Sequence, residues 1–299
     1  MKNFTIIKAI KKPLRLLWQH YYQIYMDVKS FFSKGWIVYE SSKLNLTLLL
    51  NLNSYIDFCI YAHGHYDIES LEQIARCIQK LKLLNEQSNW FLDIGSNIGL
   101  MSLFLQKKYP DLIIDAFEPL EQNFYQNKIN QQINNLSFNL HQVALSNKSA
   151  DIAEIFLNDS PIKFEYSKYN MGMASLCKNQ YRTGKRVEQC QIISFDLFLQ
   201  KQKPANYEKN KNILIKIDVE GTEMDVLKGM INFIDSIKSQ IVLIFIELLF
   251  EENLEECIHT VNFLKTKNFI FFNMSFQKIP THEFTKLRSG NFIFSRNFN

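Results

Sequence analysis

Residues 91–99 read Phe-Leu-Asp-Ile-Gly-Ser-Asn-Ile-Gly, and this stretch decides the fold. An apolar run leads into an acidic residue, Asp93, and then into a turn that contains Gly95 and Gly99. Gly95 permits close approach of the backbone to a ligand, and Gly99 permits tight packing of the next helix on the strand. The pattern predicts a buried strand, a ligand-binding turn and a helix at the ligand-binding edge of a parallel sheet.

The rest of the chain after about residue 88 continues this alternation. The expected strands are Trp90–Ile94, Leu112–Phe117, Phe138–Ala144, Ile213–Asp218 and Ile241–Glu247. The expected helices are residues 97–108, 121–133, 222–235 and 251–267. Short apolar strands separated by helices predict a mostly parallel sheet with helices on both faces. Two late strands, Phe269–Asn273 and Asn291–Ser295, have no clear helix between them, which predicts an antiparallel strand at the C-terminal edge.

Two segments precede this domain, which we place at residues 88–299. Residues 1–33 carry apolar side chains at helical spacing together with lysines, which predicts a basic amphipathic helical arm. The arm is expected either to dock on its own domain or to contact a membrane surface or partner. Residues 34–87 are expected to be a strand-rich lead-in followed by a helix, and its strand candidates are the alternating run Leu44–Leu48 and the apolar run Tyr55–Tyr61.

Residues 148–212 separate the third and fourth expected strands. This length exceeds that of a simple crossover, so we expect an insertion that faces the substrate. Its densest basic run, residues 178–186, is expected to be a solvated loop or a site for a phosphate or carboxylate of the acceptor.

Bulk composition limits the class of protein. With 46% hydrophobic and 21% charged residues, the 299-residue chain is not expected to be disordered. Its net charge of +4 is small, and the basic residues are spread along the sequence rather than clustered as in a nucleic-acid-binding surface. The five cysteines form no CxxC pair, and no run of apolar residues is long enough to span a membrane. We therefore expect a cytoplasmic protein, with peripheral membrane contact through the arm as an option and the oligomeric state open.

A second acidic signal follows the second strand, where the sequence reads Asp115-Ala116-Phe117-Glu118-Pro119. Glu118 is placed to accept hydrogen bonds from both ribose hydroxyls of an adenosine, and Asp93 to hold a cationic amino group. Dinucleotide-binding enzymes share the acidic residue, but their turn reads G-x-G-x-x-G, whereas this one reads G-S-N-I-G. The turn therefore disfavours NAD.

Carboxylates also gather after the fourth and fifth strands. Asp218, Glu220 and Glu223 follow one strand, and Glu247 ends the next. Grouped carboxylates repel one another unless they bind a proton, a cation or a positive substrate, so they are candidates for a general base or for Mg²⁺ ligands. Asp218 is the first choice for the base, and His65, with His63 and His141, offers alternatives.

The succession FLDIGSNIG, DAFEPLEQNF, HQVALSN, MGMASL, ISFDLFL, IKIDVEGTEMDVLKG and IFIEL resembles the FkbM-type methyltransferases over roughly residues 63–250. The resemblance implies a class I, Rossmann-like fold: a seven-stranded, mostly parallel sheet with an antiparallel C-terminal strand. It also implies S-adenosylmethionine as methyl donor and a hydroxyl acceptor, often on a sugar of a surface polysaccharide. The family commonly has Glu at the position of Asp67.

By position, the resemblance also implies roles for individual residues. The cofactor-binding set is Asp93, Gly95, Asn97 and Gly99 at the methionine end, Glu118 at the ribose, and Gln142, Val143 and Ala144 near the adenine. Asp218 and Glu247 are implied to face the transferred methyl group. Three alternatives stay open: a natural-product acceptor, a lipid-linked acceptor, and a silent binding protein that keeps the fold. A nucleic-acid methyltransferase is disfavoured because Asp218-Val219-Glu220 stands where an N-P-P-[YF] motif is required.

Overall fold

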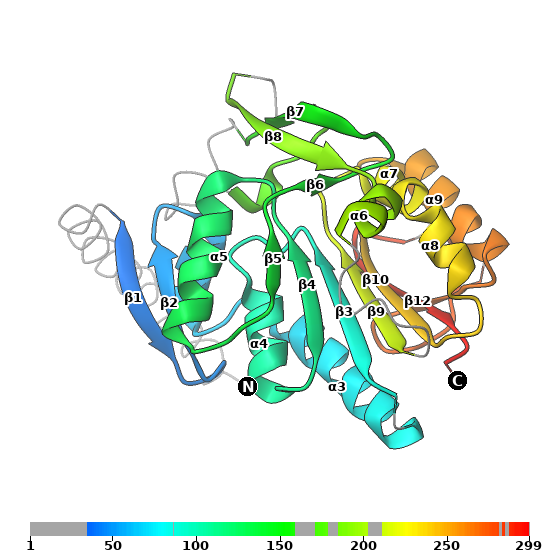
Figure 1. The fold of residues 1–299 in the computed structure, drawn as a ribbon, viewed down its shortest axis with the longest axis horizontal. Coiled ribbons are helices and arrows are strands. Elements are labelled where there is room, and N and C mark those ends of the chain that lie inside the picture. The colour runs from blue at the N-terminus through cyan, green and yellow to red at the C-terminus, as the bar shows by residue number, and fades with distance from the viewer. Residues whose placement is uncertain are drawn as a thin grey trace, which may run out of the picture.

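The computed structural model describes residues 35–85, 87–158, 171–178, 185–202, 211–280, 283–284 and 287–298. The predicted arm, residues 1–33, lies outside them. At the centre is a seven-stranded sheet of order β11-β12-β10-β9-β3-β4-β5 (Figure 1). Its strands are β3 (Asn89–Ile94), β4 (Ile113–Phe117), β5 (Asn139–His141), β9 (Asn212–Ile217), β10 (Val242–Leu248), β11 (Ile270–Asn273) and β12 (Gly290–Arg296).

The direction of the strands confirms the predicted fold class. Strands β5, β4, β3, β9 and β10 pair in parallel, whereas β12 runs antiparallel to both β10 and β11. Parallel strands end at the same edge of a sheet, so the residues that follow β3, β4 and β9 are brought together there.

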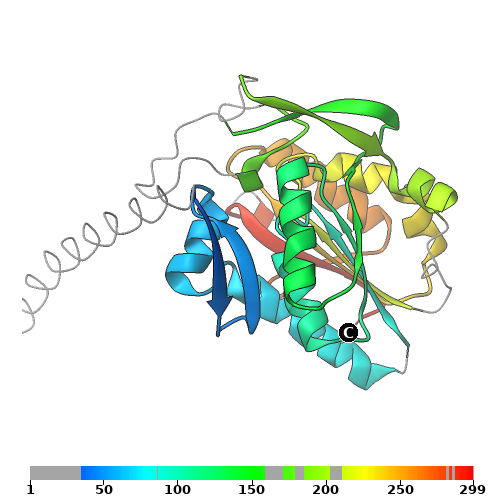
Figure 2. The same cartoon turned by 60° about the vertical axis from the view of Figure 1, so that its left-hand side comes forward.

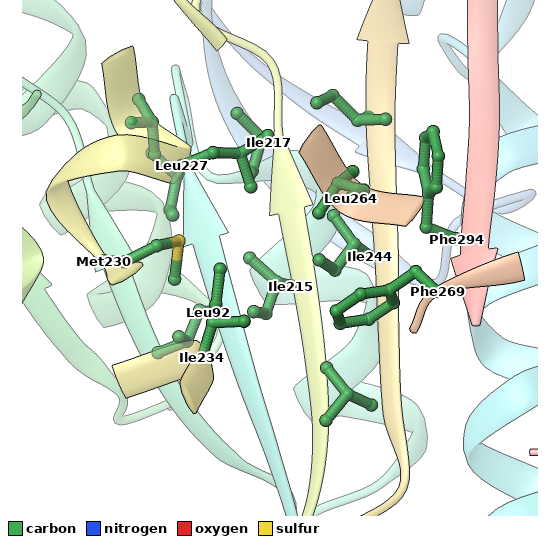
Figure 3. Packing of buried hydrophobic residues seen from close by; sticks show 14 of the residues in the cluster. Leu92, Ile215, Ile217, Leu227, Met230, Ile234, Ile244, Leu264, Phe269 and Phe294 are labelled. Carbon is green, nitrogen blue, oxygen red and sulfur yellow. The ribbon is translucent and has the colours of Figure 1, made fainter. Parts of the chain in front are cut away.

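Helices cover both faces of this sheet because successive strand residues point to opposite sides. Phe91 and Leu214 belong to a core shared with α3 (Ile68–Leu84) and α4 (Leu100–Lys108). On the other face, Leu92, Ile215 and Ile244 meet side chains of the opposing helices (Figure 3). These helices are α6 (Phe195–Gln202), α7 (Glu223–Gly229), α8 (Ile231–Ser236) and α9 (Leu254–Thr266).

The single helix predicted over 222–235 is two helices in the structure. Met230, between α7 and α8, has φ −119° and ψ 20°, which is not helical. At this break Gly229 presses on the loop after β6, and a Cβ there would lie 1.9 Å from the Ser146 carbonyl oxygen. Close packing against that loop accompanies the interruption.

The lead-in differs from the prediction in one element. Strands β1 (Trp36–Ser41) and β2 (Leu46–Asn51) form an antiparallel hairpin, but Tyr55–Tyr61, expected as a strand, lies in helix α2 (Tyr55–His63). The other edge of β2 is closed by α5 (Glu121–Ile133), where the Leu49 N–H donates to Asn130 Oδ1 at 2.7 Å. The apolar run instead satisfies its backbone groups within a helix.

The strand predicted over Phe138–Ala144 is also interrupted. It ends at His141, and the Val143 N–H donates to the His141 carbonyl oxygen in a tight turn (3.1 Å). The chain then enters a second, three-stranded sheet of β6 (Ala144–Leu145), β8 (Val187–Ile193) and β7 (Ala150–Phe156). This sheet lies at the top of the molecule in Figures 1 and 2, and the hairpin lies beside α5 in both views.

Among the described residues, no helix combines the length and apolar character needed to cross a bilayer.

Candidate active site

A cavity of about 470 Å³ opens at the carboxyl ends of the parallel strands, and this volume is that of a typical small-molecule site. Three regions of the chain build its wall. The first is the turn after β3, together with the ends of β4, β9 and β10. The second consists of the lead-in residues Tyr66 and Asp67 and of Asn291 in β12. The third consists of Val143–Leu145, Gly172 and Ala174–Leu176. Gly172 and Ala174–Leu176 come from the insertion.

The turn after β3 is held between two neighbouring strands. The N–H groups of Gly95 and Ser96 both donate to the Phe117 carbonyl oxygen at 3.0 Å. Gly95 has φ +79°, and a Cβ there would lie 1.9 Å from the Asp218 carbonyl oxygen. Glycine is therefore required at position 95 by both conformation and space.

Glu118 follows β4 and is 4% exposed on the cavity wall. Its Oε2 accepts from the Asn97 N–H at 2.8 Å and its Oε1 from the Leu120 N–H at 2.9 Å. Burial raises the pKa of Glu118 to about 7 despite these hydrogen bonds. Asn123 Nδ2 also donates to Oε1, at 3.5 Å, so Oε2 keeps an acceptor position for a ligand hydroxyl and Oε1 is shared with this amide.

Asp93 and Gly99, both predicted to contact the cofactor, do not line the cavity. The Asp93 carboxylate is fully buried: its Oδ2 accepts from Ser102 Oγ at 2.5 Å, and its Oδ1 lies 3.5 Å from Lys216 Nζ. Gly99 packs on α5, where a Cβ would lie 2.2 Å from Asn127 Oδ1. Because a lysine from the next strand is paired with Asp93, this carboxylate is not free on the wall to hold a ligand ammonium.

Three predicted carboxylates do converge on the wall. Asp218, Glu220 and Glu247 each place an oxygen within 4.8 Å of the others, close enough to hold a divalent cation between them. Burial, and next the charge of Asp218, raises the pKa of Glu247 to about 9, so at neutral pH a proton on Glu247 also relieves the repulsion. Glu223 instead lies off the wall, where it accepts from the Gly221 N–H at 2.9 Å.

The histidines and Gln142 are not brought to the cavity. His65 does not line it, and the buried His65 Nδ1 has no hydrogen-bond partner among the described residues. His63 is exposed, and His141 lies 2.9 Å from Asp115 Oδ1 with its ring stacked on Phe117. Gln142 is exposed and off the wall, in contrast to its neighbours Val143 and Ala144.

The wall residues that sequence reasoning missed include Lys216, Tyr66, Asp67 and Asn291. Asn291 Nδ2 lies 3.1 Å from Ser70 Oγ and 3.5 Å from Asp67 Oδ2, so β12 touches the start of α3. Burial, and then Asp218 and Asp67, raises the pKa of the Tyr66 hydroxyl. A lysine inside an apolar strand was a visible signal for Lys216, but no local pattern marks Asn291.

Comparison with known proteins identifies relatives of the chain. The sequence model of the methyltransferase FkbM domain matches residues 93–275. A curated protein named Methyltransferase 1, from Beauveria bassiana (strain ARSEF 2860), is 28% identical over 184 residues, which cover 58% of this chain and 72% of that protein.

Solved structures with similarity to the chain are distant from it. A S-adenosylmethionine-dependent methyltransferase from Agrobacterium tumefaciens has a TM-score of 0.42 at 9% identity, over 87% of this chain and 70% of the other. The Pyrococcus abyssi tRNA (uracil-54, C5)-methyltransferase, solved with S-adenosyl-L-homocysteine, has a TM-score of 0.39 at 11% identity, over 87% of this chain. The match spans only 44% of that larger protein.

Proposed function

The chain belongs to the FkbM methyltransferase family and is a S-adenosylmethionine-dependent methyltransferase, and from this premise we propose that it methylates a hydroxyl of a sugar in a surface polysaccharide or glycoconjugate. The observation that carries the proposal is the convergence of Asp218, Glu220 and Glu247 on one cavity wall. A sugar hydroxyl is a poor nucleophile at neutral pH, and a positioned carboxylate raises its reactivity.

The cavity has groups that fit the donor. In the proposed arrangement the backbone of Gly95–Asn97 borders the methionine part, and Glu118 accepts hydrogen bonds from the ribose hydroxyls. Val143, Ala144 and Leu176 provide an apolar surface for the adenine. The open acceptor position on the buried Glu118 Oε2 supports this assignment, because a further donor stabilises a buried carboxylate oxygen.

The donor supplies a methyl group on a positively charged sulfur, which is a good leaving group. The chain's own residues then have two tasks, alignment of the hydroxyl and removal of its proton. Asp218 is the proposed base: the hydroxyl oxygen forms the new bond to carbon, the carbon–sulfur bond breaks, and the proton passes to an Asp218 oxygen. The neighbouring Glu247, which is protonated at neutral pH, donates a hydrogen bond to the Asp218 carboxylate.

The charge of the wall supports an uncharged acceptor over a lipid-linked phosphate. Asp67, Asp218 and Glu220 are acidic, and Lys216, the basic residue among the described wall residues, is already paired with two carboxylates. A phosphate or carboxylate next to the reacting hydroxyl would meet these groups at short range. A natural-product polyol remains an alternative acceptor. Mg²⁺ held by the three converging carboxylates is the alternative to a proton on Glu247, and cytoplasmic location and membrane contact through residues 1–33 remain proposals.

Glycan analysis tests the acceptor. Surface polysaccharide from cells that lack the protein is compared by mass spectrometry with polysaccharide from cells that re-express the wild type, Asp218→Asn or Asp225→Asn. We expect loss of one methyl group per modified sugar, restored by the wild type and by Asp225→Asn, a partly exposed control on α7, but not by Asp218→Asn. An unchanged glycan in cells lacking the protein would contradict a polysaccharide acceptor.

A further inference from the structure

Lys216 is a cation in a strand whose other residues are uncharged. Strand β9 reads Asn-Ile-Leu-Ile-Lys-Ile, and the Lys216 side chain is 15% exposed. Its ammonium donates to the Gly95 carbonyl oxygen at 2.8 Å and lies 3.2 Å from Asp218 Oδ2 and 3.5 Å from Asp93 Oδ1. One cation therefore contacts the cofactor turn, the acceptor-side carboxylate and the end of β3.

The charge on Lys216 is maintained by its surroundings. Burial lowers the pKa of the ammonium, but Asp218 and then Asp93 raise it more, and the result lies above the ordinary value for lysine. Asp93 in turn needs this cation, because an ionised carboxylate with no exposed surface is strongly destabilising without a partner. Each of the two groups therefore stabilises the charge of the other.

We propose that Lys216 is a positioning residue for methyl transfer, whose ammonium holds the Gly95 carbonyl and the Asp218 carboxylate in fixed register. The inference rests on the proposed function, since it assigns Asp218 to the acceptor side and the turn to the donor. Asp93 then acts through Lys216, as its counter-ion, rather than by direct contact with the cofactor. Without the ammonium, the Asp218 side chain loses the contact that fixes its carboxylate relative to the turn, although the backbone of both strands stays paired.

The expected effect is large because transfer depends on alignment. A displacement of about 1 Å between reacting groups can lower a rate by about a hundredfold. Loss of Lys216 is therefore expected to weaken the binding of S-adenosylmethionine about tenfold and to lower the transfer rate about a hundredfold.

Chemical rescue separates positioning by the cation from simple packing. Lys216→Ala removes three methylene groups and the ammonium, which n-propylammonium replaces and n-propanol matches without the charge. Lys216 lines the cavity, so small solutes can reach the vacated space. Affinity for S-adenosylmethionine is measured by calorimetry, and transfer is measured with radiolabelled donor on polysaccharide from cells that lack the protein.

We expect n-propylammonium to restore at least about a tenth of the lost affinity and rate, and n-propanol to restore neither. Lys228→Ala removes an exposed lysine of α7 and is expected to leave both unchanged, with or without amine. Equal rescue by both solutes, or wild-type affinity and rate in Lys216→Ala alone, would overturn the inference. If the wild type binds the donor but transfers nothing to polysaccharide, the proposed acceptor fails, whereas rescue of donor affinity still tests Lys216.

A double variant keeps the test valid if Lys216→Ala does not fold. Asp93→Asn with Lys216→Met removes both members of the buried ion pair, so no unpaired Asp93 charge remains. We expect a melting temperature near that of the wild type, with affinity and rate still reduced. Wild-type affinity and rate in the double variant would show that Lys216 only balances the charge of Asp93 and would contradict a positioning role. A double variant that unfolds as readily as Lys216→Ala would show that the role of Lys216 is structural, which also contradicts positioning.

Discussion

Gly95 and Asp218 touch through their backbones, since a Cβ on residue 95 would lie 1.9 Å from the Asp218 carbonyl oxygen. This contact joins the end of β3 to the end of β9, which pair in parallel. It brings the turn assigned to the donor against the residue assigned to the acceptor. The separation of donor and acceptor is therefore set by the sheet rather than by a flexible loop.

Gly95→Ala is expected to disrupt this contact. Gly221 is the matched control: it also has a left-handed conformation, at φ +98°, but a Cβ there would meet nothing within 4 Å beyond its chain neighbours. Gly221→Ala should cost about 1 kcal/mol of unfolding free energy from backbone strain alone. Gly95→Ala should cost several times more and should abolish donor binding. Thermal melts and calorimetry measure both effects, and equal stability of the two variants would contradict the close contact.

The buried Asp57 predicts how stability changes with pH. Burial raises its pKa from 3.8 to about 7, although Gln126 Nε2 donates to its Oδ1 at 2.8 Å. The folded state thus holds a proton that the unfolded state releases near pH 4, and the stabilisation is complete below that pH and lost as pH rises towards 7. Asp57→Asn should flatten the fall in unfolding free energy over this range.

The control for this measurement is Asp225→Asn, on the partly exposed surface of α7. Chemical denaturation at a series of pH values gives the slope for each variant. The buried Glu118 and Glu223, whose pKa values are both raised to about 7, retain part of the slope in every variant. An Asp57→Asn protein with the full wild-type slope would contradict the burial of an acid at this position.

Chelation tests how the carboxylates on the cavity wall are neutralised. Burial is the main cause that raises the pKa of Glu247 to about 9, so this residue holds a proton at neutral pH. That proton is sufficient to relieve the repulsion between the carboxylates. We therefore expect removal of divalent cations to change the transfer rate less than about twofold. A loss of tenfold or more that Mg²⁺ reverses would instead make Asp218, Glu220 and Glu247 metal ligands.

The central sheet was predictable because buried parallel strands and amphipathic helices leave strong patterns in the sequence. The run Tyr55–Tyr61 was assigned wrongly because a short apolar segment fits a strand or a helix equally well. In the structure it does not extend the hairpin, and the outer edge of β2 is instead closed by Asn130, which is 81 residues from Leu49 along the chain. The break after His141 was missed for a similar reason, since a second sheet takes up the following residues.

The site was predictable where its residues follow strands directly, as Gly95, Glu118 and Asp218 do. The position of Asp93 under the wall was not predictable, because the sequence does not show that Lys216 of the neighbouring strand points at it. Asp67 and Asn291 are 224 residues apart, and only the folded chain places them on one wall.

Equilibrium binding of the donor tests the central claim most directly. Wild-type protein, Glu118→Gln and the exposed control Glu121→Gln are titrated by calorimetry with S-adenosylmethionine, S-adenosylhomocysteine and NAD. We predict saturable binding of both sulfur compounds to the wild type and to Glu121→Gln, and none of NAD. Glu118→Gln should bind them at least about tenfold more weakly, since its amide nitrogen replaces one carboxylate oxygen, faces a backbone donor and accepts no ribose hydroxyl. Wild-type protein that binds neither sulfur compound would contradict the account.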